Sequence, residues 1–220
     1  MIDIYKYENE LYEKGYKLIA GCDEAGRGPM AGPLVASSVI LPVGYRLEGL
    51  NDSKKLTAKK RDQLFDIIMR DAVEVTVTVV SVEDVDKLNV YSASKYAMTE
   101  CVKKFKNKPD YVLTDCMPLE EIEKSGIEVL DIIKGDAKSA SIAASSIIAK
   151  VTRDRIMDKL DEEFPQYGFK KHKGYVTKLH REMIAKYGVT VHHRKTFAPV
   201  REIIEKNNGE LWKQEELKLF

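Results

Sequence analysis

The stretch from Leu18 to Pro33 constrains the fold more than any other part of this 220-residue sequence. An apolar run over 18–22 ends in two adjacent acids, Asp23 and Glu24, and the segment Gly-Arg-Gly-Pro follows over 26–29. Glycine frees the backbone and proline lacks an amide donor, so neither a regular strand nor a regular helix is expected to continue through 26–29. The stretch therefore predicts a buried strand that ends at Asp23 in a tight turn.

The two acids at the end of this predicted strand are candidate metal ligands. A strand that is buried on both faces excludes charge unless the charge is hydrogen-bonded, paired or bound to a cation. The glycines beside the acids let backbone N–H groups approach a ligand such as a phosphate closely. Carboxylates that hold a metal, beside amides that hold a phosphodiester, indicate a nuclease.

Two other interpretations of the glycines stay open at the level of this stretch alone. A strand followed by a glycine-rich turn is often only a turn. Gly26, Gly28 and Ala31 also satisfy a loose dinucleotide-binding pattern, but Pro29 and Pro33 interrupt the helix that would carry the pyrophosphate. No Gly-Lys-Ser or Gly-Lys-Thr follows, which excludes a Walker-type phosphate loop.

The rest of the chain alternates predicted strands and helices. Apolar and β-branched runs predict strands over 17–23, 34–41, 73–82, 111–114 and 128–133. Helical periodicity predicts helices over 2–13, 58–70, 83–88, 90–105, 141–164, 175–187 and 199–206. This order is typical of an α/β protein with a mixed five-stranded sheet flanked by helices. We expect residues 1–165 to form that catalytic domain and residues 166–220 to form a C-terminal helical, basic, substrate-binding subdomain packed on it.

The positive charge of the chain is concentrated near its C-terminal end. The formal net charge is only +1, but residues 166–200 contain eight lysines or arginines against one acid, Glu182. Such a block is typical of a surface that binds a polyanion, although a solvated basic face is the common alternative. Three cysteines without close spacing indicate a reducing compartment, and no apolar run approaches the about 20 residues of a membrane span. We therefore expect a cytoplasmic protein without a membrane partner.

Acids follow three of the predicted strands, namely Asp23 with Glu24, then Asp115, and then Asp136. Because sites in open α/β sheets form where strands end, we expect these four carboxylates to lie near one another. They would repel unless divalent cations lay between them, and oxygen ligands suit Mg²⁺ or Mn²⁺ rather than zinc. Two such ions about 3.5 to 4 Å apart can activate a water and stabilise the leaving 3′ oxygen of an in-line phosphodiester displacement.

The sequence resembles the ribonuclease HII family, the type 2 ribonucleases H. The resemblance extends over residues 15–204 and rests on the segment Asp-Glu-Ala-Gly-Arg-Gly-Pro at 23–29 and on blocks in the family's order at 51–56, 135–139, 143–154, 172–175 and 193–194. It implies the ribonuclease H-like fold. The acids at the strand ends, Asp23, Glu24, Asp115 and Asp136, are the catalytic and metal-binding residues that we expect.

The resemblance further implies the substrate: the RNA strand of RNA–DNA hybrids, and single ribonucleotides embedded in duplex DNA. Cleavage on the 5′ side of the ribonucleotide would leave a 3′ hydroxyl and a 5′ phosphate. By the same resemblance, Gly26, Arg27 and Gly28 contact the 2′-hydroxyl of the ribonucleotide and the adjoining phosphate, and Tyr175 stacks on the deoxyribose that follows. The 2′-hydroxyl is the group by which a protein distinguishes RNA from DNA at a given position.

Several assignments stay open at this level. Lys54 and Lys55, in a predicted polar loop, either reach a substrate phosphate or face water. The protein is either this metal-dependent endonuclease or a nucleic-acid-binding module that uses the basic block alone, with structural acids. Whether a sliding-clamp protein binds residues 209–220 is also open.

Overall fold

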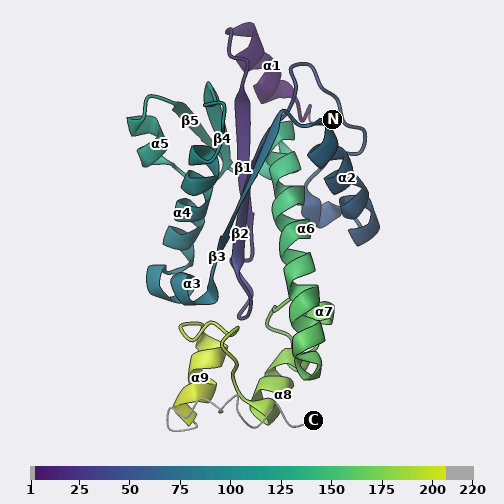
Figure 1. Cartoon of the computed structure of the whole chain (residues 1–220), viewed down its shortest axis with the longest axis vertical. Helices are drawn as coiled ribbons and strands as arrows, with labels where there is room; N and C mark the ends of the chain where they lie inside the picture. Colours follow the sequence, from purple (N-terminus) through teal and green to yellow (C-terminus); the bar gives the residue numbers. More distant parts are fainter. Residues whose placement is uncertain (1–2, 207–220) are drawn as a thin grey trace.

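The computed structural model describes residues 3–206, which are built around a mixed five-stranded sheet (Figure 1). The strands are β1 (Ile19–Ala25), β2 (Leu34–Ile40), β3 (Glu74–Val80), β4 (Tyr111–Asp115) and β5 (Glu128–Ile132), in the order β3-β2-β1-β4-β5. The β1–β2 and β2–β3 pairs are antiparallel, whereas the β1–β4 and β4–β5 pairs are parallel. The predicted mixed sheet is therefore confirmed.

Helices connect and cover the strands. The α-helices of the described residues are α1 (Lys6–Glu13), α2 (Ala58–Asp71), α3 (Val82–Leu88), α4 (Val90–Lys103), α5 (Glu120–Lys124), α6 (Ala140–Glu163), α7 (Phe169–His172), α8 (Lys178–Tyr187) and α9 (Ala198–Lys206). Three short 3₁₀ turns complete the structure: η1 (Ser53–Lys55), η2 (Gly135–Ala137) and η3 (Pro165–Tyr167). None of the helices in residues 3–206 combines the length and the hydropathy needed to cross a bilayer.

Different helices cover the two faces of the sheet (Figure 1). On one face, Ala93, Ala97 and Met98 of α4 belong to an apolar core with side chains of β1 and β2. On the other face, α6 packs on the sheet and α2 packs on α6. A Cβ atom added to Gly21 would lie 2.1 Å from the carbonyl carbon of Ser141, so only glycine lets α6 lie this close to β1. The long α6 is thereby held directly against the strand that carries Asp23.

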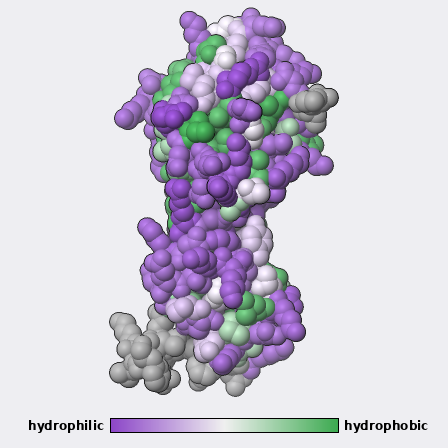
Figure 2. Space-filling model, turned by 90° about the vertical axis from the view of Figure 1, so that its right-hand side faces the viewer, coloured by the Kyte–Doolittle hydropathy of each residue, from purple (hydrophilic) through white to green (hydrophobic). Residues whose placement is uncertain are grey.

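The helices α7, α8 and α9 lie around the C-terminal end of α6, and the outline of the molecule narrows where they join the sheet region (Figures 1 and 2). They share an apolar core in which Tyr167, Phe169 and Ile184 pack with Met157 of α6 and with Met30. Met30 belongs to the connection between β1 and β2. This core therefore joins the glycine-rich connection to the C-terminal helices.

The structure differs from the sequence predictions mainly at element boundaries. The first strand continues through Glu24 to Ala25 before Gly26 turns the chain with a φ of +103°. The helix predicted over 175–187 begins only at Lys178, because Thr177 is extended and caps it: its Oγ1 accepts a hydrogen bond of 3.2 Å from the amide of His180. The short helix α5 was not predicted, and the region 209–220 lies outside the described residues.

Candidate active site

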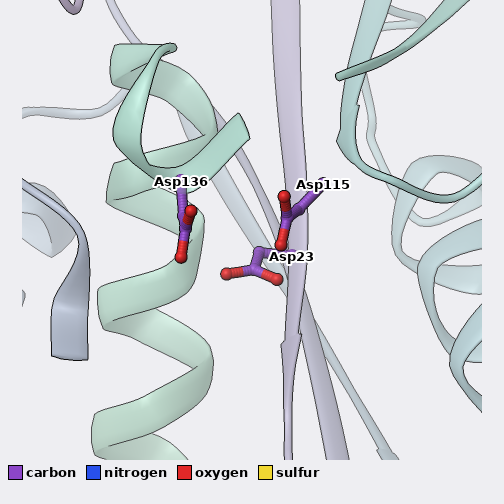
Figure 3. Close-up of side chains that lie close together, drawn as sticks. All are labelled: Asp23, Asp115 and Asp136. Carbon is purple, nitrogen blue, oxygen red and sulfur yellow. The ribbon is translucent and has the colours of Figure 1, made fainter. Parts of the chain in front are cut away.

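Three aspartates converge at one edge of the sheet (Figure 3). Asp23 lies near the end of β1, Asp115 is the last residue of β4, and Asp136 lies in η2 between β5 and α6. One carboxylate oxygen from each aspartate lies within 4.8 Å of the other two. The parallel pairing of β1 and β4 sets Cys22 opposite Thr114, so the aspartate that follows each of them falls at the same level of the sheet.

Local hydrogen bonds orient each of these carboxylates. Asp23 Oδ1 accepts a hydrogen bond of 2.7 Å from the amide of the residue that follows it. Asp115 Oδ1 accepts one of 2.7 Å from the amide of Gly135, which ties β4 to η2. Asp136 Oδ2 accepts one of 3.1 Å from Lys54 Nζ of η1. Backbone amides and one lysine thus hold three carboxylates of like charge close together.

Glu24 lies beside the three aspartates and is not a member of their group. Its Oε1 atom lies 3.3 Å from Arg27 Nη1. Its Oε2 atom is buried and has no hydrogen-bond partner among the described residues. A buried carboxylate oxygen without a partner is costly, and a metal ion would satisfy it. The predicted group of four acids is therefore a cluster of three aspartates with one glutamate next to it.

The electrostatics of the site favour a bound cation. Burial raises the pKa of Asp23 well above its usual range, and repulsion from Glu24 and Asp115 adds to this rise. Burial raises the pKa of Glu24 to about 6, although Arg27 opposes the rise. Burial also raises the pKa of Asp115. A divalent cation would stabilise the ionised form of all three acids, and a ligand set made of carboxylate oxygens suits Mg²⁺ or Mn²⁺.

Asp23, Glu24 and Asp115 open into a cavity of about 240 Å³, and Asp136 lies behind its lining, paired with Lys54. The lining comes from β1, the connection after it, η1, β4, α6 and the turn before α8, and consists of Asp23, Glu24, Ala25, Gly26, Arg27, Gly28, Ser53, Lys54, Asp115, Ser146, Lys150, Arg153 and Tyr175. The structure thus brings the predicted substrate contacts Gly26, Arg27, Gly28, Lys54 and Tyr175 together with the acids. Lys55 is exposed and does not line this cavity.

Three polar lining residues of α6 are not among the predicted site residues, although the sequence contains a signal for them. Ser146, Lys150 and Arg153 are spaced four and three residues apart, which places them on one face of α6. Lys150 Nζ donates a hydrogen bond of 2.6 Å to Asp154 Oδ1, which holds its ammonium group at the cavity. The polar residues at helical spacing in an otherwise small and apolar segment were the available sign of a functional face.

Two buried arginines hold the connection between β1 and β2 in place. Arg153 donates to the carbonyl oxygens of Ala31 and Pro33 at 2.9 and 3.0 Å, and to that of Lys173 at 2.9 Å. Arg194 donates to Gly32 O through Nε and Nη2 at 3.1 and 2.9 Å. Both side chains are fully buried and bond backbone carbonyls in these contacts. The connection between β1 and β2, which we call the glycine segment, is therefore held by α6 and by the chain between α8 and α9.

Gly26 and Gly28 have different surroundings. A Cβ atom on Gly26 would lie 2.4 Å from Arg153 Nε, so Gly26 is required by the packing as well as by its φ. A Cβ atom on Gly28 would meet only Tyr175 Cε1, at an ordinary contact distance of 3.6 Å. The Tyr175 side chain is 46% exposed and faces Gly28 across the cavity. Gly28 is therefore the glycine at which an added methyl group tests ligand contact with little disturbance of the fold.

Comparison with known proteins agrees with this arrangement. The family model described as Ribonuclease HII matches residues 20–200. The chain is 51% identical over 204 residues to the Ribonuclease HII of Acholeplasma laidlawii (strain PG-8A), and this match covers 93% of the chain and 98% of the relative.

Solved structures show the same fold. The crystal structure of the ribonuclease H2 from Pyrococcus horikoshii OT3 matches with a TM-score of 0.75 at 28% identity, covering 87% of this chain and 99% of that one. The RNase HII of Archaeoglobus fulgidus, solved in complex with PCNA, matches with a TM-score of 0.70 at 30% identity, covering 82% and 95% of the two chains. The family model spans the sheet, the three aspartates and α8, and the chain therefore belongs to the ribonuclease HII family of ribonuclease H hydrolases.

Proposed function

We propose that this protein hydrolyses the RNA strand of RNA–DNA hybrids and cuts on the 5′ side of single ribonucleotides embedded in duplex DNA. The products would carry a 3′ hydroxyl and a 5′ phosphate. The observation that carries the proposal is the presence, in one cavity, of carboxylates for a metal and of Gly28 opposite Tyr175. The carboxylates support the hydrolysis. The pair of Gly28 and Tyr175 supports recognition of the position at which the strand is cut.

The four acids Asp23, Glu24, Asp115 and Asp136 are the proposed metal ligands. When bound there, Mg²⁺ or Mn²⁺ supplies an activated water and stabilises the leaving 3′ oxygen. Backbone amides hold Asp23 and Asp115 in their orientations before any ligand arrives. The unpartnered Oε2 of Glu24 gives this residue a free ligand atom in the same cavity.

The residues around the turn after β1 are the proposed readers of the ribonucleotide. The glycine at position 28 leaves the backbone accessible to a 2′-hydroxyl, and the partly exposed guanidinium of Arg27 can reach the adjoining phosphate. The exposed ring of Tyr175 offers a flat surface for the following deoxyribose. Lys54 is placed to contact a phosphate at the cavity, and Lys55 is proposed to contact one outside it.

The basic residues of 166–200 are the proposed sequence-independent contacts with the duplex. The division into a catalytic part, 1–165, and a basic subdomain, 166–220, is supported by η3, which begins at Pro165, and by the separate apolar core of the C-terminal helices. All three cysteines are unpaired, which supports a reducing, cytoplasmic location.

A sliding clamp is the proposed protein partner. The support is the Archaeoglobus fulgidus relative, which was solved in complex with PCNA. The proposed contact segment is 209–220. A chain that lacks this segment should lose binding to a clamp and keep its cleavage rate on a short duplex.

The experiment that tests the proposal uses a 5′-labelled DNA duplex with one ribonucleotide and an all-RNA strand paired with DNA. The proposal predicts a single cut on the 5′ side of the ribonucleotide, a 3′ hydroxyl on the labelled product, and no cut in an all-DNA duplex. Gly28→Ala should lose cleavage at the single ribonucleotide, because the methyl group displaces the 2′-hydroxyl. Tyr175→Phe should keep most activity, whereas Tyr175→Ala should lose on the order of 1 to 3 kcal/mol, the scale of aromatic stacking on bases.

The same experiment separates the alternative. A nucleic-acid-binding module would retain the labelled duplex and cut neither substrate. If Tyr175→Ala leaves both rates unchanged, or if Tyr175→Phe is as damaging as Tyr175→Ala, the stacking role of Tyr175 is wrong.

A further inference from the structure

A cluster of buried histidines lies next to Tyr175, and the proposed chemistry does not use it. His180 and His193 are fully buried, and His172 is 8% exposed. The rings of His172 and His180 stack with centroids 4.2 Å apart, and Phe169 meets His180 edge-on at 5.5 Å. Histidine is expensive to bury unless both ring nitrogens are satisfied, so the partners of these nitrogens show what the cluster does.

The hydrogen bonds of two of these rings form a path that has one possible direction. The amide of Thr190 can only donate, so His193 Nδ1, at 3.0 Å from it, accepts. A neutral His193 then carries its proton on Nε2, which lies 3.1 Å from His180 Nε2 and donates to it. His180 therefore carries its own proton on Nδ1 and donates it to the carbonyl oxygen of Tyr175 at 3.0 Å. That carbonyl can only accept, so both ends of the path require the same arrangement of protons.

Both rings must be uncharged for this path to exist. A second proton on either ring would set two N–H groups against each other, at Thr190 or between the histidines. The pKa values agree with the geometry: burial lowers the pKa of His180 to about 4 and that of His193 to about 3. The path is therefore a neutral, ordered chain at physiological pH.

The path ends on the backbone that carries the substrate-facing ring. The ring of Tyr175 is 46% exposed, so packing alone does not hold it. Its backbone belongs to a tight turn in which Lys173 and Gly174 have φ values of +50° and +83°. The turn is fastened on its other side by a hydrogen bond of 3.0 Å from the amide of Met30 to the carbonyl of Gly174. The next carbonyl along, that of Tyr175, accepts one hydrogen bond of 3.0 Å from the nearby amide of Thr177 and one from His180, which ties it to a buried side chain of α8.

We propose that His180 and His193 are positioning residues that hold the backbone of Tyr175 and thereby set its ring against Gly28 at the ribonucleotide junction. This inference rests on the proposed role of Tyr175 in substrate recognition. The histidines touch neither substrate nor metal and act only through Tyr175. Their removal should therefore affect recognition of the junction and leave the three-aspartate cluster as it is.

The experiment compares variants of the full chain on the duplex with one ribonucleotide, with KM and kcat measured separately. His180→Leu removes both hydrogen bonds and should lower kcat/KM by about tenfold, mainly through KM, while the rise in Tm on adding Mn²⁺ stays that of the wild type. His180→Asn can still donate a hydrogen bond from the position of Nδ1, so its kcat/KM should be close to that of the wild type. His192→Gln is the matched control, because the His192 ring meets Phe164 edge-on and takes no part in the path.

A double variant decides whether the histidine acts through Tyr175. If it does, His180→Leu combined with Tyr175→Ala should be no worse than Tyr175→Ala alone, because the ring that the histidine positions is already gone. Multiplied losses in the double variant, or full activity of His180→Leu, would overturn the inference. Should His180→Leu fold poorly, His193→Asn serves instead, since it keeps the acceptor for Thr190 and does not reach His180. Failure of the proposed function is a different result, namely no cleavage by the wild type.

Discussion

Lys54 Nζ lies 3.1 Å from Asp136 Oδ2, so a lysine of η1 is paired with one aspartate of the three-aspartate cluster. The Asp136 side chain is 6% exposed, whereas that of Lys54 is 75% exposed. Because the lysine end of this ion pair is in water, the pair adds little stability, and the ammonium group can leave Asp136 at low cost. We therefore expect Lys54 to exchange the aspartate for a substrate phosphate.

We predict that Lys54→Gln weakens binding to the duplex and lowers the slope of log affinity against log salt concentration by about one, the share of one phosphate contact. Binding in Ca²⁺ at several salt concentrations measures this. Lys55→Gln is the matched variant, because Lys55 is its exposed neighbour outside the cavity, and it should change the affinity less. An unchanged slope for Lys54→Gln would show that Lys54 faces solvent and makes no phosphate contact.

Asp115→Asn should abolish cleavage and raise the Tm of the metal-free protein. Asparagine keeps an oxygen that can accept from Gly135, but it removes one anionic ligand. Burial raises the pKa of Asp115, so its ionised form is unfavourable in the fold above that pKa, and a neutral side chain relieves this cost at pH 7. Asp131→Asn, on exposed β5 surface, is the control and should change neither quantity. If Asp115→Asn kept more than about a tenth of the wild-type activity, Asp115 would not be a metal ligand.

Arg153→Lys should destabilise the protein by on the order of 1 to 3 kcal/mol, because a lysine cannot replace three hydrogen bonds to separate carbonyls. The glycine segment would loosen, so kcat should fall as well. Arg155→Lys lies two residues along the same helix, is half-exposed, and should stay within about 0.5 kcal/mol of the wild type. Urea unfolding of both variants measures the difference. Equal losses would mean that the buried arginine has no special part in holding the segment.

The buried histidines should make the protein less stable in acid. Their folded-state pKa values, about 4 for His180 and about 3 for His193, lie below the ordinary value of 6.5. Below pH 6.5 the unfolded chain therefore binds protons that the folded chain does not bind. The free energy of unfolding falls as the pH falls from 6.5. At pH 5 each histidine should cost on the order of 1 to 2 kcal/mol.

Urea unfolding at pH 7 and pH 5 tests this prediction. The loss between the two pH values should be smaller in His193→Gln than in the wild type. Comparing the variant with the wild type at each pH cancels the contribution of the active-site acids, whose raised pKa values act in the opposite direction. An identical loss in both proteins would show that His193 is not the group that resists protonation.

The placement of the acids could be predicted from the sequence because it depends on strand topology. Asp23 and Asp115 each end an apolar run, and strands that end together bring such residues together. The exact membership of the cluster could not be predicted, since both Asp23 and Glu24 remain in β1 and only Asp23 joins the other two aspartates. That distinction depends on hydrogen bonds to Arg27 and to backbone amides that no sequence pattern reports.

The surroundings of Tyr175 were less accessible to sequence reasoning. The sequence predicts a helix that begins at residue 175, but Thr177 is extended and caps the helix at Lys178, so Tyr175 lies in the turn before it with an exposed ring. A Cβ atom on Gly174 would lie 2.3 Å from Ala31 O, so the turn is dictated by a contact with a segment more than 140 residues away in the sequence. The histidine path likewise joins side chains whose contact depends on the tertiary structure.

We propose that the clustered acids hold the metal with which the protein cuts a strand beside a ribonucleotide. The most direct measurement is cleavage of a 5′-labelled duplex with one ribonucleotide in EDTA, and then after Mg²⁺ or Mn²⁺ is added in excess. We predict no cut in EDTA and a single cut on the 5′ side of the ribonucleotide, with a 3′ hydroxyl end, once the metal is added. Cleavage that persists in EDTA, or binding of the duplex with no cut in either metal, would contradict it.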